Sequence, residues 1–134
     1  MGLDDVRVMV VDDVVDSANM LAMVLEMDGY TVRTANNGEE ALRAVEQFAP
    51  LCVLLDIHMP GLSGHALAQQ LRIRYGDEIV LVAVTGEGDA DDRISDSFSQ
   101  FDHYLRKPVD MALLKKLLPP VVVVDMPASL AADR

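Results

Sequence analysis

The run Ile79-Val80-Leu81-Val82-Ala83-Val84-Thr85 restricts the fold of this chain more than any other feature. It is apolar at successive positions, without the alternation of a strand that has one face in water. We therefore expect a central parallel strand that is covered on both faces. Similar short strands are predicted at residues 7–11, 30–35, 51–56 and 103–105.

Segments with the apolar spacing of helices alternate with these strands. The predicted helices begin at a cap at Asp16 or Ser17, at Asn37, at Ser63 and at Asp110, and end near residues 28, 48, 75 and 118. A weak, acidic helix is expected over residues 89–101. Five strand-helix units of this kind predict an α/β fold with a doubly wound, five-stranded parallel sheet. Ligands of such sheets bind at the carboxyl ends of the strands.

Length, charge and cysteine content exclude several classes of protein. The 134 residues favour one domain, and the net charge of -11 argues against direct binding to nucleic acid. Cys52 is the single cysteine, so no disulfide forms within the chain and a cytoplasmic location is expected. No apolar stretch is long enough to cross a membrane. The acidic start, Met1 to Asp5, does not resemble a signal peptide.

Polar residues stand where the predicted strands end. Asp12 and Asp13 follow the first strand, Asp56 ends the third, Thr85 ends the fourth, and Lys107 comes just after the fifth. One acid at a strand end is usually a helix cap or a solvated loop residue. Because the carboxyl ends of parallel strands meet at one edge, the five side chains together predict a functional site.

Three carboxylates in one place repel one another unless a cation lies between them. Oxygen ligands favour a hard divalent ion, and magnesium suits a small site that keeps some of its water. A carboxylate beside this ion can attack phosphorus and form an aspartyl phosphate. A lysine charge and a threonine hydroxyl nearby would stabilise the transferred group.

Four stretches, VMVVDD, LLDIHMPGLSG, AVTGEG and YLRKPV, occur in the order and spacing of a known family. Together they resemble the receiver domain of two-component response regulators. In their amino-acid sequence they are most similar to the receivers of hybrid sensor histidine kinases. The resemblance implies a flavodoxin-like fold with sheet order 2-1-3-4-5. It also implies a receiver domain over residues 1–118 and a tail or linker over residues 119–134.

The resemblance assigns a role to each residue at the strand ends. It implies that Asp56 accepts the phosphoryl group and that Asp12, Asp13 and Asp56 bind Mg²⁺. The backbone carbonyl of His58, two residues past the acceptor, would complete the protein ligands.

It further implies that Thr85 and Lys107 contact the phosphoryl oxygens. Tyr104 matches the switch aromatic, which turns inward when Thr85 moves. The Lys107-Pro108 bond is expected to be cis, as in the family.

The implied function is a phosphoacceptor signalling module in a two-component system or phosphorelay, and not an enzyme in the ordinary sense. The phosphoryl donor would be a sensor histidine kinase or a phosphotransfer protein. A downstream protein, not identified by the sequence, would read the surface of the fourth helix, fifth strand and fifth helix. A homodimer through that surface is an open alternative, as is the choice between a stand-alone regulator and part of a hybrid kinase.

Two other functions use similar features. A phosphatase with an aspartate nucleophile would carry a second acid two residues later, where this chain has His58. A flavodoxin-like cofactor binder would need hydroxyl residues and glycine after the first strand, where Asp12 and Asp13 would repel a phosphate. Both are less consistent with the sequence than a receiver.

Three further expectations concern the rest of the chain. Core filling is predicted for methionines in apolar segments, which are Met9, Met20, Met23, Met27 and Met111. A left-handed residue at Gln100, where the family commonly has glycine, would cost about 1 kcal/mol. The run Val121 to Val124 is a disordered tail, the start of a linker, or an added edge strand.

Overall fold

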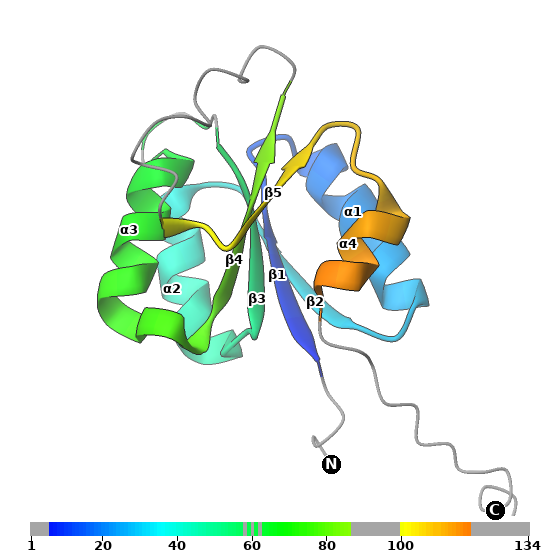
Figure 1. The fold of residues 1–134 in the computed structure, drawn as a ribbon. Helices are drawn as coiled ribbons and strands as arrows, with labels where there is room; N and C mark the ends of the chain where they lie inside the picture. The colour runs from blue at the N-terminus through cyan, green and yellow to red at the C-terminus, as the bar shows by residue number, and fades with distance from the viewer. Residues whose placement is uncertain (1–5, 58, 60, 62, 87–99, 119–134) are drawn as a thin grey trace, which may run out of the picture.

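The structure, a computed structural model, describes residues 6–57, 59, 61, 63–86 and 100–118. Its strands are β1 (Arg7–Val11), β2 (Thr31–Ala35), β3 (Cys52–Asp56), β4 (Val80–Thr85) and β5 (His103–Arg106). Neighbouring strands are all parallel, and their order is β2-β1-β3-β4-β5 (Figure 1). The predicted fold class and sheet order are confirmed.

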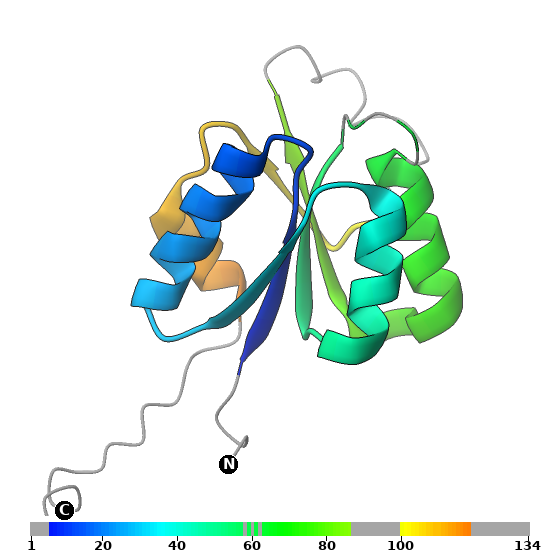
Figure 2. The ribbon, with the colours of Figure 1, turned by 180° about the vertical axis from the view of Figure 1, so that it is seen from behind.

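Four α-helices are present in the described part of the chain: α1 (Val15–Met27), α2 (Gly38–Phe48), α3 (Gly64–Tyr75) and α4 (Met111–Leu117). A short 3-10 helix, η2 (Gly76–Glu78), follows α3. Figures 1 and 2 show α1 and α4 on one face of the sheet and α2 and α3 on the other. The helix expected over residues 89–101 lies outside the described residues except for Gln100 and Phe101.

The first residues of the helices show which caps could be predicted from the local sequence. Asn37 Oδ1 accepts a hydrogen bond from the backbone N–H of Glu40, and the Asp110 side chain caps α4, as predicted. The predicted cap of α1 at Asp16 or Ser17 is wrong, because α1 begins at Val15 and Val14 is its cap residue. Asp12 Oδ1 accepts from the Val14 N–H at 3.0 Å, so an acid of the preceding strand end supports this helix start.

Two hydrophobic cores lie on opposite faces of the sheet. Along β3, Val53 and Leu55 pack into the core under α2 and α3, while Cys52 and Leu54 pack into the core under α1 and α4. Successive residues of a strand point to opposite faces, so a strand that is apolar throughout needs cover on both. In β4, Leu81 and Ala83 belong to the first of these cores and Val82 and Val84 to the second, so the prediction from the run at residues 79–85 is confirmed.

Arg72 of α3 joins the start of β5 to the start of β4. Its guanidinium donates to the backbone carbonyls of Gly76, Ile79 and Gln100 at 2.8 to 2.9 Å and to Asp102 Oδ2 at 2.6 Å. The same Asp102 oxygen accepts from the backbone N–H of Leu81. These contacts fix the chain as it enters β5.

The prediction that the methionines of apolar segments fill the core holds for Met9 and is wrong for Met20, Met23 and Met27. Met9 is fully buried, whereas the three α1 methionines are exposed. The reason is that Ala18, Leu21, Ala22 and Leu25 already supply the face of α1 that meets the sheet.

In the described helices, no segment combines the length and the hydrophobicity that crossing a membrane requires.

Candidate functional site: an acidic cluster at the carboxyl edge of the sheet

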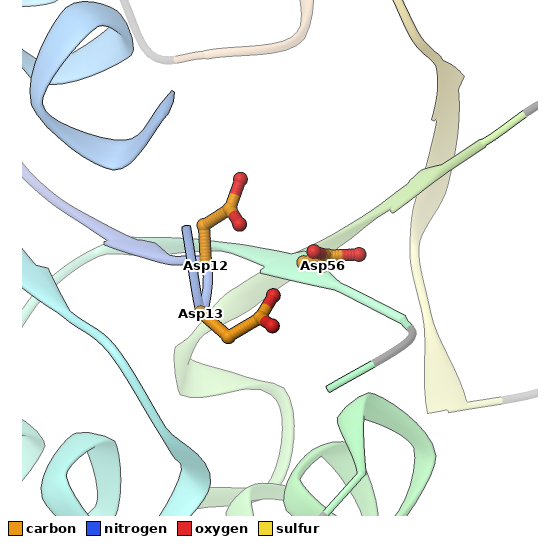
Figure 3. Close-up of side chains that lie close together, drawn as sticks. All are labelled: Asp12, Asp13 and Asp56. Carbon is orange, nitrogen blue, oxygen red and sulfur yellow. The ribbon is translucent and has the colours of Figure 1, made fainter. Parts of the chain in front are cut away.

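The three predicted acids come together at the carboxyl ends of β1 and β3. Carboxylate oxygens of Asp12, Asp13 and Asp56 all lie within 4.8 Å of one another (Figure 3). Asp12 and Asp56 are buried, and Asp13 is the more exposed member. β1 and β3 are neighbours in the sheet, which brings together residues that are 44 positions apart. The parallel pairing therefore creates the cluster.

Lys107 supplies the positive charge of the site. Its Nζ lies 3.5 Å from Asp56 Oδ2 and 3.9 Å from Asp12 Oδ2. The Lys107-Pro108 peptide bond is cis, as expected. The Lys107 N–H donates to the Thr85 carbonyl at 2.7 Å, which ties this loop to the end of β4. Lys107 is thus positioned to offset part of the negative charge of the acids.

The backbone around Asp12 is held by groups that the sequence reading missed. The side-chain amide of Asn36 donates to the Asp12 carbonyl at 3.0 Å, and the Asp12 N–H donates to Ala35. Asn36 directly follows β2, so its position at a strand end was the available signal. It was missed because β2 was not expected to contribute to the site.

A close backbone approach holds α3 against the end of β3. The Gly64 N–H donates to the Ile57 carbonyl at 3.1 Å. A Cβ on Gly64 would lie 2.6 Å from the Asp56 carbonyl oxygen and 2.8 Å from Ile57 Cα. Both distances are shorter than a Cβ tolerates, so only glycine fits here without moving the backbone beside Asp56.

The predicted switch residues lie on adjacent strands. Thr85 is buried, and its hydroxyl donates to the Leu105 carbonyl at 3.5 Å, the long end of the hydrogen-bond range. Tyr104 is 37% exposed, and its ring centre lies 6.2 Å from that of Phe101. Desolvation raises the pKa of Tyr104. Phe101, which was not predicted from the sequence, has its ring centre 6.2 Å from that of His65 on α3 as well.

Two predictions from the sequence concerned the backbone at His58 and at Gln100. His58, expected to bind the metal through its carbonyl, lies outside the described residues. Gln100 does not adopt the left-handed conformation; among the described non-glycine residues only Ala49 has a positive φ. The strain considered for Gln100 is therefore absent.

The donor set of the cluster fits a magnesium ion. Three carboxylates supply hard oxygen ligands within one small volume, and among the described residues no cysteine or histidine belongs to the group. Mg²⁺ is commonly held by one or two carboxylates plus water and phosphate oxygens. Two buried acids beside a more exposed one can provide such a half-open site.

Comparisons with known proteins agree with this geometry. The family model for the response regulator receiver domain matches residues 8–119. The probable transcriptional regulator ycf27 of Guillardia theta is 39% identical over 102 residues, which are 76% of this chain and 39% of that protein. The sensor histidine kinase RcsC of Salmonella typhimurium is 36% identical over 115 residues, 86% of this chain and 12% of the kinase. The chain thus spans only a part of these curated relatives.

Solved structures show the same fold. The response regulator TrrA of Thermotoga maritima, in complex with Mg²⁺ and BeF, superposes with a TM-score of 0.75 at 33% identity, covering 83% of this chain and 94% of that one. The family match extends over every element that carries the acidic cluster, Thr85 and Lys107. With its fold, its strand-end residues and these relatives in agreement, the chain belongs to the response regulator receiver domain family, the signalling module of two-component systems.

Proposed function

We propose that this chain accepts a phosphoryl group on Asp56 from a phosphohistidine of a sensor kinase or phosphotransfer protein. The observation that carries the proposal is the position of the Asp56 carboxylate, which is buried, faces Lys107 at 3.5 Å and lies within 4.8 Å of two further acids. We assign the receiver to residues 1–118 and a tail or linker to residues 119–134. We place the reaction in the cytoplasm, which the buried free thiol of Cys52 suits.

In the proposed reaction an Asp56 carboxylate oxygen attacks phosphorus. The bond from phosphorus to the histidine nitrogen breaks, and that nitrogen keeps the bonding electrons and takes up a proton. A magnesium ion held by Asp12, Asp13 and Asp56 would neutralise charge on the transferred group. Lys107 provides a second positive charge at the same oxygens, and burial of Asp56 limits competing water.

The signal would leave the site through Thr85 and Tyr104. New phosphoryl oxygens on Asp56 offer the Thr85 hydroxyl a better acceptor than the Leu105 carbonyl at 3.5 Å. Movement of Thr85 would free space beside Tyr104, whose half-exposed ring would then turn inward. The surface formed by β5, α4 and the residues near Phe101 would change most, and a downstream protein would read it. The use of this same surface for a homodimer belongs to the proposal too.

Mass spectrometry tests the acceptor. The parent protein, Asp56→Asn and the control Asp16→Asn are incubated with acetyl phosphate and Mg²⁺. Asp16 lies in the first turn of α1, outside the acidic cluster, so its variant is expected to gain one phosphoryl group like the parent. Asp56→Asn is expected to gain none, and an equal gain in all three proteins would refute the assignment.

The switch has a separate test. NMR spectra are recorded with and without beryllofluoride, which stands in for the phosphoryl group. Shifts are expected at Thr85, Tyr104 and Phe101, beyond the loops that hold the acids. Shifts that stop at Asp12, Asp56 and Lys107 would show that the switch does not operate in this protein.

A further inference from the structure

Asp12 and Asp13 are consecutive in the sequence, yet both of their side chains belong to the acidic cluster. Successive residues of an extended chain point to opposite sides. The carboxylate oxygens of Asp12 and Asp13 nevertheless lie within 4.8 Å of each other and of Asp56, and the chain bends at Asp13, just after β1. A contact outside β1 must therefore hold the peptide between Asp12 and Asp13 in its orientation.

Repulsion among the carboxylates opposes this arrangement, because it favours conformations in which the three acids move apart. The Asp12 side chain has partners of its own, since its Oδ1 accepts from the Val14 N–H at 3.0 Å and its Oδ2 faces Lys107 at 3.9 Å. In the described part of the chain, no donor group contacts the Asp13 carboxylate. The position of Asp13 therefore depends on its backbone.

The side chain of Asn36 supplies the backbone contact. Its Nδ2 donates to the Asp12 carbonyl oxygen at 3.0 Å. This carbonyl belongs to the planar peptide unit that joins Asp12 to Asp13, so the contact restricts ψ of Asp12 and φ of Asp13 together. The Asp12 N–H donates to the Ala35 carbonyl at 3.1 Å. Both main-chain groups of Asp12 are thus tied to the end of β2.

The start of α2 in turn fixes Asn36. The Asn36 N–H donates to Glu40 Oε1 at 2.9 Å, and the Glu40 N–H donates to Asn37 Oδ1 at 2.8 Å. These contacts resemble a capping box, in which the first turn of a helix holds the residues before it. Asn36 is also half-buried, which limits competition from water for the Asp12 carbonyl. The orientation of Asp13 is therefore coupled to the first turn of α2.

We propose that Asn36 is a positioning residue that makes the acidic cluster selective for Mg²⁺ over Ca²⁺. Mg²⁺ requires near-ideal octahedral geometry with ligands at about 2.0 to 2.1 Å, whereas Ca²⁺ accepts variable geometry at about 2.3 to 2.6 Å. An Asp13 carboxylate that is held through its backbone suits the stricter ion, and one that moves freely loses this advantage. The inference rests on the proposed function, because it requires a divalent cation among Asp12, Asp13 and Asp56.

Separate titrations with Mg²⁺ and Ca²⁺, followed through the amide NMR signals of the full chain, test this role. Removing a partner that orients a metal ligand typically lowers metal affinity by about 10- to 100-fold. For Asn36→Ala we expect the dissociation constant to rise about tenfold for Mg²⁺ and less than about threefold for Ca²⁺. The matched control is Asn37→Ala, which loses an asparagine hydrogen bond within the start of α2. Its preference for Mg²⁺ over Ca²⁺ should equal that of the parent.

Asn36→Asp separates the effect of the hydrogen bond from that of charge. A carboxylate at this position cannot donate to the Asp12 carbonyl, and its negative charge would by itself strengthen the binding of both ions. We expect the ratio of Mg²⁺ to Ca²⁺ affinity to fall in this variant, as in Asn36→Ala. An unchanged ratio in both variants would overturn the proposal, because general destabilisation or added charge acts on the two ions alike.

Glu40 offers a second pair of variants. Glu40→Gln keeps a side-chain oxygen that can accept from the Asn36 N–H, whereas Glu40→Ala does not. The ratio of Mg²⁺ to Ca²⁺ affinity should fall in Glu40→Ala and stay close to that of the parent in Glu40→Gln. Where the Asn36 variants do not fold, equal ratios in this pair would overturn the proposal.

The same samples distinguish failure of this inference from failure of the proposed function. A parent protein that binds no Mg²⁺, or that gains no phosphoryl group from acetyl phosphate, contradicts the proposed function. A parent that binds Mg²⁺ and gains the phosphoryl group, together with Asn36 variants of unchanged selectivity, contradicts only the role of Asn36.

Discussion

Replacement of Asp13 by asparagine is expected to stabilise the folded protein when divalent cations are absent. Carboxylate oxygens of Asp12, Asp13 and Asp56 lie within 4.8 Å of one another. At this separation two unit charges repel by about 0.9 kcal/mol in a medium like water, and by about 3.5 kcal/mol at an effective dielectric constant of about 20. Asp13→Asn removes two such repulsions and keeps the shape of the side chain.

The water-like value is the appropriate one, because Asp13 is the most exposed member of the cluster. Two repulsions of this size amount to about 1.7 kcal/mol, and salt screens part of them. The contacts of Lys107 with Asp56 at 3.5 Å and Asp12 at 3.9 Å remain in the variant. We therefore expect the free energy of unfolding to rise by about 1 kcal/mol, and by no more than about 1.7 kcal/mol.

Urea denaturation in chelator measures this change, and Asp16→Asn is the matched control. Asp16 lies in the first turn of α1, where a negative charge interacts favourably with the helix dipole. Its removal is expected to lower stability by about 0.3 to 1 kcal/mol, the opposite sign to Asp13→Asn. Mg²⁺ at ten times its dissociation constant should stabilise the parent by about 1.4 kcal/mol and Asp13→Asn much less.

Two results would refute this reasoning. If Asp13→Asn is destabilised in chelator as Asp16→Asn is, the acids do not repel as their separation requires. If Mg²⁺ stabilises the parent and Asp13→Asn equally, Asp13 is not a ligand.

Three further substitutions test other parts of the structure. Arg72→Ala should lower the free energy of unfolding by about 2 to 3 kcal/mol, because it removes the hydrogen-bond donors to several backbone carbonyls. The control Arg74→Ala removes only an exposed ion pair and should lower it by less than about 1 kcal/mol. Equal losses in urea denaturation would contradict this prediction. Gly64→Ala should lower the free energy of unfolding by about 1 to 3 kcal/mol and slow phosphoryl gain from acetyl phosphate, because the added Cβ would lie 2.6 Å from the Asp56 carbonyl oxygen. Unchanged stability and an unchanged rate would disprove this close approach. Burial raises the pKa of the Cys52 thiol from 9.0 to about 12, so the stability that the neutral thiol contributes is complete below about pH 9 and is lost as the pH rises toward 12. Cys52→Ala should therefore lose less stability than the parent between these pH values. Equal losses in the two proteins would show that Cys52 does not titrate in this way.

Much of the fold and the acid cluster could be predicted from local sequence. The unbroken apolar runs required strands covered on both faces, and their alternation with helices required a parallel sheet. In a parallel sheet the carboxyl ends share one edge, so Asp12, Asp56 and Lys107 had to lie near one another. The caps at Asn37 and Asp110 were also predictable, because each involves only neighbours in the sequence.

Contacts between distant segments could not be predicted in this way. Nothing in the sequence near Arg72 indicates that Gln100 and Asp102 lie within reach of its guanidinium. The contact of Asn36 with the Asp12 carbonyl depends on β2 lying beside β1. Such partners are fixed by the order and register of the strands, which local patterns do not specify residue by residue.

The sequence by itself determined the period of each element, the residues at which the strands end and the chemistry gathered there, because these depend on neighbouring residues and on the geometry common to parallel sheets. Only the tertiary structure decided which apolar residues are buried. α1 is apolar on two sides, and its period alone cannot say which side meets the sheet. Packing selected the side of Ala18 and Leu25, which fits closely against the strands, and this left Met20 and Met27 exposed on the other.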